Sequence, residues 1–250
     1  MIKLKSPEQI NRIRKASVLV AEVLSELQKA VTPGVSTLEL DSLARELIQE
    51  RNGRPAFLGY MGFPGAICAS VNEAVIHGIP NKKPLSSGDV VSIDCGIEFE
   101  GYYGDAAVTI PVGTINSQIQ QLLDVTRQSL YLGIDQALPG NRINDISQAV
   151  YGHVKQHNYG VVRPYCGHGV GIDIHEDPQV PNYVGRGPNP RLKVGMVIAI
   201  EPMVNLGVDE VDLLSDEWTV VTRDRQVSAH FEHTVAIRET GPEILSVCDN

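Results

Sequence analysis

Residues 88–110 read GDVVSIDCGIEFEGYYGDAAVTI and decide the fold, because their alternating apolar residues predict two long strands joined by a tight turn. The turn is predicted at residues 98–101, and the strands carry Asp94 and Asp105. If the strands pair symmetrically about Phe99 and Glu100, the two carboxylates lie directly opposite each other. Directly opposed like charges destabilise a sheet. The hairpin therefore predicts a bound cation that the side chains themselves do not supply.

The hairpin belongs to an order of predicted elements that occurs twice. Capping boxes at residues 6–9 (SPEQ) and 36–39 (STLE) open a helix that continues to about residue 30 and a second that ends near residues 52–53. Beyond the hairpin, helices are predicted from residue 117 to about 137 and from residue 144 to about 157. Helix, helix and strands thus follow one another in both halves of the chain.

Short sequences repeat in the same order, which indicates an internal repeat. IHGIP at residues 76–80 is echoed by IHEDP at 174–178, and GDVVSID at 88–94 by GMVIAIE at 195–201. We predict one α+β domain, residues 1–250, built from two halves of approximately 1–112 and 113–250. A pseudo-two-fold axis would place both curved antiparallel sheets around a shared centre, with helices outside.

Four carboxylates would meet at that centre, because Asp94 corresponds to Glu201 and Asp105 to Glu232 in the repeat. Four such groups cannot all stay ionised in a partly buried site without compensation, so two divalent cations are predicted. His168, within the glycine-rich CGHGVG, is the best candidate for a nitrogen ligand. This donor set suits manganese, iron, cobalt or zinc. Two such ions can activate a shared water and polarise a carbonyl, which indicates hydrolysis.

The overall composition excludes several other classes. The 250 residues, 42% of them hydrophobic, can bury a sizeable core. A net charge of −9 argues against nucleic-acid binding, so no DNA partner is expected. The four cysteines lack CxxC spacing, so neither a zinc finger nor a disulfide framework is indicated. No segment reads as a signal peptide or membrane span, and a cytoplasmic protein without membrane contact is expected.

The other histidines have simpler explanations. His153 and His157 are spaced by four residues on a predicted helix, but no HExxH motif surrounds them, and they are expected at the surface. His230 and His233 flank Glu232, and packing or supporting roles are expected for both.

The five predicted ligands and their contexts resemble those of the methionine aminopeptidases of the pita-bread fold. The contexts are IDCG around Asp94, GDAA around Asp105, GHGVG around His168, IEPM around Glu201 and FEHT around Glu232. The resemblance covers essentially the whole chain and favours the minimal type I form of bacteria and organelles. It implies removal of the initiator methionine from nascent polypeptides, preference for a small second residue, and a water that bridges two divalent metals as the nucleophile.

The resemblance also implies individual roles. Asp105 and Glu232 match the carboxylates that bridge the metals, Asp94 one that chelates the first, and His168 and Glu201 those that hold the second. Glu201 matches the residue credited with general acid–base catalysis. Two histidines of the repeat match residues that contact substrate: His77 near the scissile nitrogen, and His175 as a donor to the carbonyl oxygen.

A methionine side-chain pocket is implied by four further positions, which are Tyr60, Phe63, Cys68 and Trp218. A soft, mostly apolar pocket suits a thioether. Residues 172–174 match a wall that varies among such enzymes. Asn72 and Ser228 match positions near which a monovalent cation is bound. A monomer is expected.

The first helix and the segment before it carry a basic cluster: Lys3, Lys5, Arg12, Arg14 and Lys15. The simplest interpretation is a solvated helix face. The resemblance adds an expectation of weak contact with the ribosome.

Two other functions are compatible with these residues. A prolidase or Xaa-Pro aminopeptidase would use the same fold, but such relatives usually carry an extra N-terminal domain, for which there is no room before residue 7. A non-catalytic protein that binds peptides or RNA would typically have lost metal ligands, whereas all five are present here.

Overall fold

The computed structural model describes residues 1–248. Its α-helices are α1 (Pro7–Ala30), α2 (Thr37–Glu50), α3 (Ser117–Asp135) and α4 (Ile143–Lys155), and a short 3₁₀ turn, η1, spans Tyr60–Gly62. All four predicted helices are confirmed to within two residues at either end. Both capping boxes form, since the Ser6 and Ser36 hydroxyls accept backbone N–H hydrogen bonds from Gln9 (3.2 Å) and Glu39 (3.3 Å).

The first half of the chain supplies five strands: β1 (Arg54–Pro55), β2 (Cys68–Val71), β3 (Ala74–Ile76), β4 (Val90–Phe99) and β5 (Tyr102–Pro111). The second half supplies β6 (Gly160–Val161), β7 (Gly167–Gly169), β8 (Glu176–Val180), β9 (Val197–Ile200), β10 (Met203–Asn205), β11 (Val211–Leu213), β12 (Val220–Thr222), β13 (Ser228–His230), β14 (Glu232–Arg238) and β15 (Gly241–Ile244).

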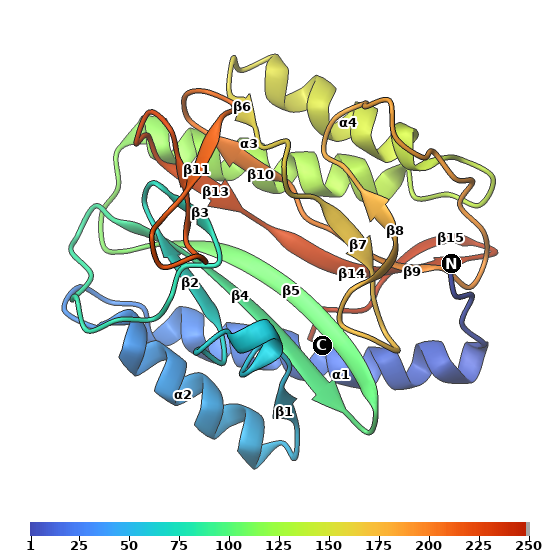
Figure 1. The fold of residues 1–250 in the computed structure, drawn as a ribbon, viewed down its shortest axis with the longest axis horizontal. Coiled ribbons are helices and arrows are strands. Elements are labelled where there is room, and N and C mark those ends of the chain that lie inside the picture. Colours follow the sequence, from blue (N-terminus) through green and yellow to red (C-terminus); the bar gives the residue numbers. More distant parts are fainter. Residues whose placement is uncertain (249–250) are drawn as a thin grey trace.

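One antiparallel sheet of nine strands forms the centre of the molecule, in the order β1-β4-β5-β14-β9-β7-β8, with β2 added on β4 and β15 on β14. Two smaller three-stranded sheets, β13-β10-β6 and β11-β12-β3, lie beside it. In Figure 1 the long β4–β5 hairpin curves across the middle of the molecule. Strands β5 and β14 join the two predicted halves through two residue pairs, Ala107 with Glu232 and Ala106 with His233.

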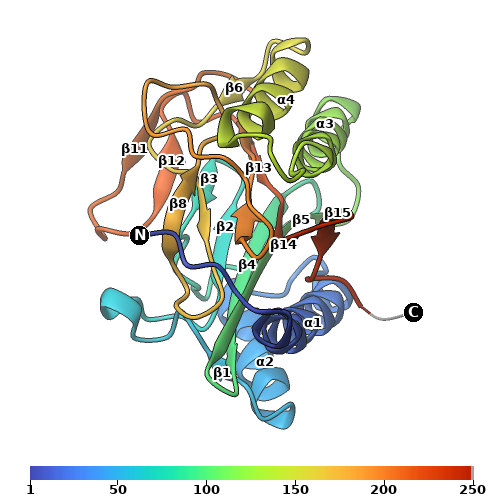
Figure 2. The same cartoon turned by 90° about the vertical axis from the view of Figure 1, so that its right-hand side faces the viewer.

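The helices cover the face of the sheet opposite the carboxylates. Odd-numbered β4 residues, including Val91 and Ile93, pack with α1 and α2 in one apolar cluster, whereas Asp94 points to the other face. Ile198 and Ile200 of β9 pack similarly with α3 and α4. Figure 2, an end view, shows the two helix pairs as separate groups along the sheet. The predicted α+β class is confirmed, while the division into two related halves stays a prediction.

The predicted register of the hairpin is wrong by two residues. Phe99 pairs with Tyr102, so Asp94 lies opposite Ala107, and Asp105 lies opposite Gly96. The reason is the turn: Glu100 and Gly101 have φ values of 51° and 80°, which gives a two-residue turn with both central residues in the left-handed region. Because the error is even, both aspartates stay on one face as diagonal neighbours.

Within residues 1–248, no helix combines the length and apolar character needed to cross a membrane.

Candidate metal centre

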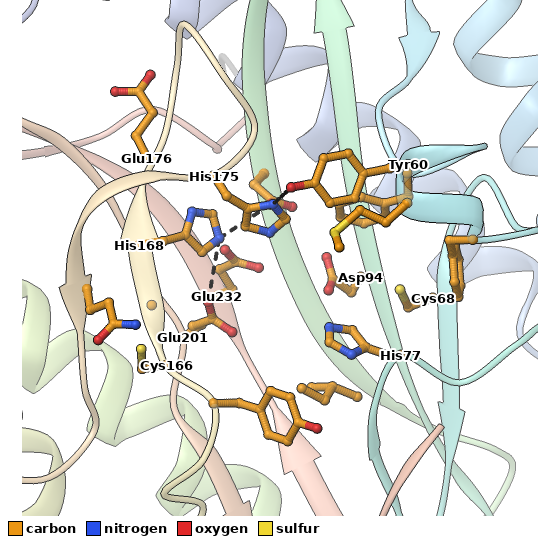
Figure 3. A pocket seen from close by; sticks show the side chains of 18 of the residues that line it. Tyr60, Cys68, His77, Asp94, Cys166, His168, His175, Glu176, Glu201 and Glu232 are labelled. Carbon is orange, nitrogen blue, oxygen red and sulfur yellow. Dashed lines mark hydrogen bonds and ion pairs between the residues drawn. The ribbon is translucent and has the colours of Figure 1, made fainter. Parts of the chain in front are cut away.

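A cavity of about 690 Å³ opens on the face of the sheet away from the helices. All eleven residues predicted from the sequence as metal-ligating, catalytic or substrate-binding line it: Tyr60, Phe63, Cys68, His77, Asp94, Asp105, His168, His175, Glu201, Trp218 and Glu232. They come from strands and loops in both halves of the chain. The fold therefore gathers the predicted set into one place, and Figure 3 labels most of its members.

The four carboxylates and His168 form two overlapping groups of potential metal ligands. The first group is Asp94, Asp105 and Glu232, and the second is His168, Glu201 and Glu232. In each group, one potential ligand atom from every residue lies within 4.8 Å of those of the other two. Nε2 of His168 lies 3.6 Å from a Glu201 oxygen and 3.8 Å from Asp105. Glu232 belongs to both groups, so the arrangement has room for two adjacent ions that share a carboxylate.

Burial makes this cluster electrostatically unfavourable without a cation. Asp105 and Glu232 are 2% and 3% exposed, and burial, followed by repulsion from neighbouring carboxylates, holds the pKa of each well above its ordinary range. Burial raises the pKa of Asp94 to about 6. One carboxylate oxygen of each of these three residues is buried without a hydrogen-bond partner. Unpartnered buried oxygens are costly, and hard divalent cations are the partners that they fit.

Glu201 differs from the other three carboxylates because histidines surround it. Burial alone would raise its pKa, but the neighbouring His230 and His168 outweigh that effect and lower it. Nε2 of His230 lies 3.4 Å from a Glu201 oxygen, and His230 is 1% exposed. The backbone is also held, since the Asn182 amide donates to the Glu201 carbonyl (2.9 Å). The supporting role predicted for His230 thus has a definite contact, whereas nothing in the sequence pointed to Asn182.

Two histidines on loops face the carboxylates from the cavity walls. His77 has a left-handed backbone (φ 57°), and its ring packs edge-on against Tyr165 and Trp218. His175 lies with its ring 4.4 Å from that of His168, and its Nδ1 is 3.1 Å from the Tyr60 hydroxyl. Loss of hydration lowers the pKa of both, that of His175 to about 4, so neither ring is charged at neutral pH.

The remaining wall is largely apolar. Phe63 and Trp218 contact each other edge to face, with ring centroids 5.0 Å apart. Cys68 is 5% exposed, and burial raises the pKa of its thiol well above the ordinary value, which opposes a nucleophilic role. Phe57 and Tyr165 also line the wall, although neither the repeat nor the resemblance had pointed to them.

Several predicted residues lie outside this cavity. Residues 172–174 are absent from the described cavity lining; Ile174 is buried in the core instead. Asn72 and Ser228 meet elsewhere, where the Ser228 N–H donates to the Asn72 carbonyl (2.9 Å), and cation binding there stays a prediction. His153 on α4 and His157, two residues beyond the end of that helix, pack ring against ring, and both are only partly exposed. His233 bonds to Ser246 and takes no part in the carboxylate groups described above.

Comparison with known proteins agrees with this geometry. The sheet and the cluster of acids and histidine define a metallopeptidase, and the model of Metallopeptidase family M24 matches residues 11–239. Methionine aminopeptidase of Clostridium acetobutylicum is 49% identical over 250 residues, with 100% of both chains covered. Methionine aminopeptidase 1 of Bacillus subtilis is 50% identical over 246 residues, 98% of this chain and 99% of the relative.

Solved structures give the same result. Methionine aminopeptidase from Rickettsia prowazekii superimposes with a TM-score of 0.96 at 40% identity, over 99% of this chain and 100% of that one. Prolidase from Pyrococcus furiosus matches with a TM-score of 0.80 at 25% identity, over 99% of this chain and 66% of that one. The predicted pita-bread fold is confirmed. The chain belongs to metallopeptidase family M24 and, within it, to the methionine aminopeptidases.

Proposed function

We propose that this chain removes the N-terminal methionine from nascent polypeptides whose second residue is small. The observation that carries the proposal is the single cavity in which the acidic cluster lies beside an apolar wall of Phe63, Cys68 and Trp218. Relatives that are about half identical over the full length bear the name of this activity. An apolar wall with a buried sulfur suits the thioether side chain of methionine.

Five residues would hold two divalent ions. Asp94, Asp105 and Glu232 would bind one ion, and His168, Glu201 and Glu232 would bind the other. Asp105 could also contribute to the second ion, because one of its oxygens lies 3.8 Å from Nε2 of His168. When bound, the ions would polarise the scissile carbonyl and lower the pKa of the attacking water. This mostly oxygen donor set with one imidazole suits cobalt, manganese, iron and zinc.

The residues of the chain would then bind and orient the substrate and move its protons. Glu201, which the nearby histidines keep ionised, would accept a proton from the attacking water and deliver it to the leaving amine. Neutral His175, oriented by Tyr60, would donate a hydrogen bond to the carbonyl oxygen as charge develops there. His77, which lies across the carboxylates from His168 in Figure 3, would contact the scissile nitrogen.

Peptide hydrolysis by the purified protein tests the proposal. After chelation, the protein is reloaded with each of the four metals in turn under reducing conditions, and Met-Ala-Ser, Met-Leu-Ser and Ala-Pro peptides are compared. We expect turnover of Met-Ala-Ser to exceed that of the other two by at least about 100-fold, and uptake of about two metal equivalents. Preference for Ala-Pro would indicate a prolidase instead.

Two variants with a matched control complete the test. Asp105→Asn and Glu232→Gln should lose turnover and at least one metal equivalent by calorimetry. Asp124→Asn, an exposed acid paired with Arg127 on α3, should retain both. Wild-type turnover by either of the first two variants would exclude the proposed site.

The proposed setting is the cytoplasm, with the protein acting as a monomer close to the ribosome. Each residue of the basic cluster is paired with an acid of the same chain, for example Arg12 with Glu8 and Arg14 with Glu243, so little free positive charge is available. Co-sedimentation of the protein with ribosomes at rising salt measures the expected weak contact.

A further inference from the structure

The connection between β7 and β8 carries His175 at its end and has no regular secondary structure of its own. It comprises residues 170–175, and β8 begins at the next residue, Glu176. Gly171 donates its N–H to the Asp173 carbonyl (3.0 Å) and accepts from the Tyr103 N–H (2.8 Å). Such a segment holds a catalytic geometry only if other groups satisfy and fix its backbone.

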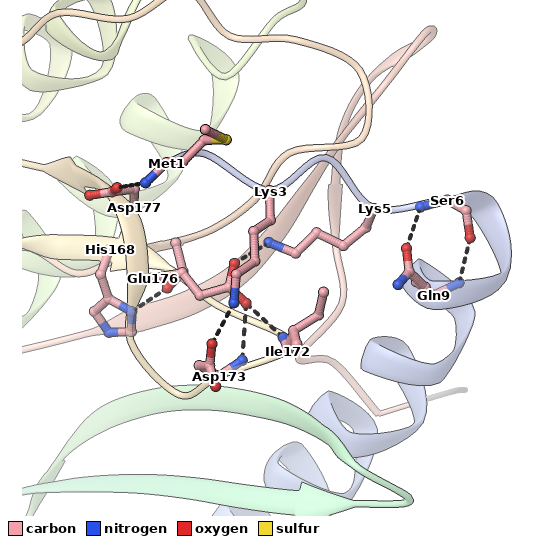
Figure 4. Close-up of polar contacts among 11 residues, drawn as sticks. Met1, Lys3, Lys5, Ser6, Gln9, His168, Ile172, Asp173, Glu176 and Asp177 are labelled. Atoms are coloured by element: carbon pink, nitrogen blue, oxygen red, sulfur yellow. Dashed lines mark hydrogen bonds and ion pairs between the residues drawn. The ribbon is translucent and has the colours of Figure 1, made fainter.

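The Glu176 carboxylate supplies this fixation. One of its oxygens accepts the backbone N–H groups of Ile172 (2.7 Å) and Asp173 (3.0 Å), which folds the connection around the side chain (Figure 4). The other oxygen accepts from Nζ of Lys5 at 2.7 Å. The Glu176 carboxylate thus accepts three hydrogen bonds from groups of the same protein. Because His175 is the next residue along the backbone, these hydrogen bonds also hold His175 in place.

Lys5 is unusual among lysines because its side chain is 1% exposed, and that of Glu176 is 2% exposed. Lysine is almost never fully buried unless it is paired. The backbone of Lys5 is fixed as well, since its N–H donates to the Gly195 carbonyl (2.7 Å), and Ser6 directly after it caps α1. The segment before α1 thus presents a rigid ammonium group to Glu176, 171 residues away in sequence.

The connection between β7 and β8 also packs directly against α1 and the segment before it. A side-chain carbon added to Gly171, whose φ is +134°, would meet Ile13 of α1 at 2.4 Å and the Lys5 side chain at 3.5 Å. Glu176 lines the cavity, whereas Lys5 is not among the lining residues described. Any effect of Lys5 on a bound substrate must therefore pass through Glu176 and the connection.

We propose that Lys5 is a positioning residue, which holds His175 in its working place by pairing with Glu176. Lys3, on the same segment, pairs with Asp173 of the same connection at 2.5 Å, but both side chains of that pair are substantially exposed. Water can replace an exposed partner and cannot reach a buried one, so only the Lys5 pair governs the connection. This inference rests on the proposed function, because it assigns His175 a role at the substrate carbonyl.

A kinetic test uses Lys5→Met, with Lys3→Met as the matched control. Lys5→Met should lower kcat for Met-Ala-Ser about 10- to 100-fold with little change in KM, because the displaced hydrogen bond forms chiefly in the transition state. Lys3→Met should change kcat less than about twofold. Lys5→Met introduced into His175→Ala should cause no further loss, since the two residues act as one unit. An equal loss from Lys5→Met in both backgrounds would show a merely structural role and overturn the proposal.

Two measurements do not depend on turnover. Hydrogen exchange at the Ile172 and Asp173 amides should accelerate at least about tenfold in Lys5→Met and stay unchanged in Lys3→Met. Metal uptake should be the same in wild type, Lys5→Met and Lys3→Met, because neither substitution touches a predicted ligand. If the wild-type protein fails to hydrolyse Met-Ala-Ser, the proposed function falls while the exchange result still decides whether Lys5 holds the connection. Unchanged exchange at these amides in Lys5→Met would overturn the proposal.

If Lys5→Met folds poorly because Glu176 is left as an unpaired buried charge, the double variant Lys5→Met/Glu176→Gln removes both charges and keeps an acceptor oxygen for the two amides. That variant should fold, show slower exchange at Ile172 and Asp173 than Lys5→Met, and recover part of kcat. A double variant no better than Lys5→Met on these measurements would contradict the positioning role.

Discussion

Replacing Asp94 by asparagine should stabilise the protein when no metal is bound. Burial raises the pKa of Asp94 from an ordinary value of 3.8 to about 6, and its buried Oδ1 has no hydrogen-bond partner. The folded state therefore favours the neutral carboxyl, and this contribution is present below pH 3.8 and lost as the pH rises through 6. Two pKa units correspond to about 3 kcal/mol, which is the expected upper limit of the gain in unfolding free energy at pH 7.

Urea unfolding with a chelator present measures this gain at a series of pH values. The difference between Asp94→Asn and wild type should approach its full size above pH 7 and disappear toward pH 4. With saturating metal the order should reverse, because the wild-type protein gains binding free energy that the variant lacks.

Asp41 provides a matched control, since it is also a buried aspartate but is fully hydrogen-bonded. It is 2% exposed, and its oxygens accept the N–H groups of Ala66 (2.6 Å) and Ile67 (3.2 Å) and pair with Arg45 (2.7 Å). Asp41→Asn should destabilise the protein by about 1–3 kcal/mol with or without metal. If Asp94→Asn destabilises the metal-free protein as Asp41→Asn does, the acidic cluster carries no electrostatic cost and the reasoning is refuted.

Three further outcomes are expected. Burial alone would raise the pKa of Asp209, but hydrogen bonds from Lys155 and neighbouring groups outweigh that effect and lower it. The Asp209 carboxylate therefore stabilises the fold above its ordinary pKa of 3.8. Wild type should thus lose more stability than Asp209→Asn as the pH falls from 5 to 3 in acid titrations. Gly104→Ala should lower the free energy of unfolding in urea by about 3 kcal/mol or more, because the new carbon would lie 2.5 Å from the α1 backbone. Gly152→Ala should instead raise it by up to about 1 kcal/mol, because the nearest atom to the new carbon is 3.7 Å away and alanine favours the helix α4. Trp218→Ala should raise KM for Met-Ala-Ser about tenfold, measured by steady-state kinetics, and an unchanged KM would remove Trp218 from the methionine pocket.

The parts of the fold that the sequence predicted are those with local causes. Helix starts at Ser6 and Ser36 follow from capping chemistry within four residues, and strand faces follow from alternation. The hairpin register failed because turn type depends on backbone angles at Glu100 and Gly101, which the letters EFEG leave open. The error did no harm to the site prediction, since a shift of two residues preserves the face.

The residues of the candidate site could be predicted where the sequence around them occurs in both halves of the chain. They could not be predicted where their role depends only on a contact formed in the folded structure. Asp94 and Glu201, like Asp105 and Glu232, share a local context, so the repeat indicated all four. Lys5 and Asn182 have no such context. Their significance comes from partners more than fifteen residues away, and only the folded chain brings those atoms within 3 Å.

The narrow junction between β5 and β14 has a consequence for how the molecule comes apart. Ten residue pairs join β4 to β5, whereas two join β5 to β14, and the carboxylates lie on both sides of that junction. A divalent ion at this junction, with Asp105 and Glu232 among its proposed ligands, would cross-link segments that are more than 120 residues apart. Without such an ion the acidic groups of Asp105 and Glu232 would face each other across this junction uncompensated, and unfolding of the metal-free protein is expected to begin there.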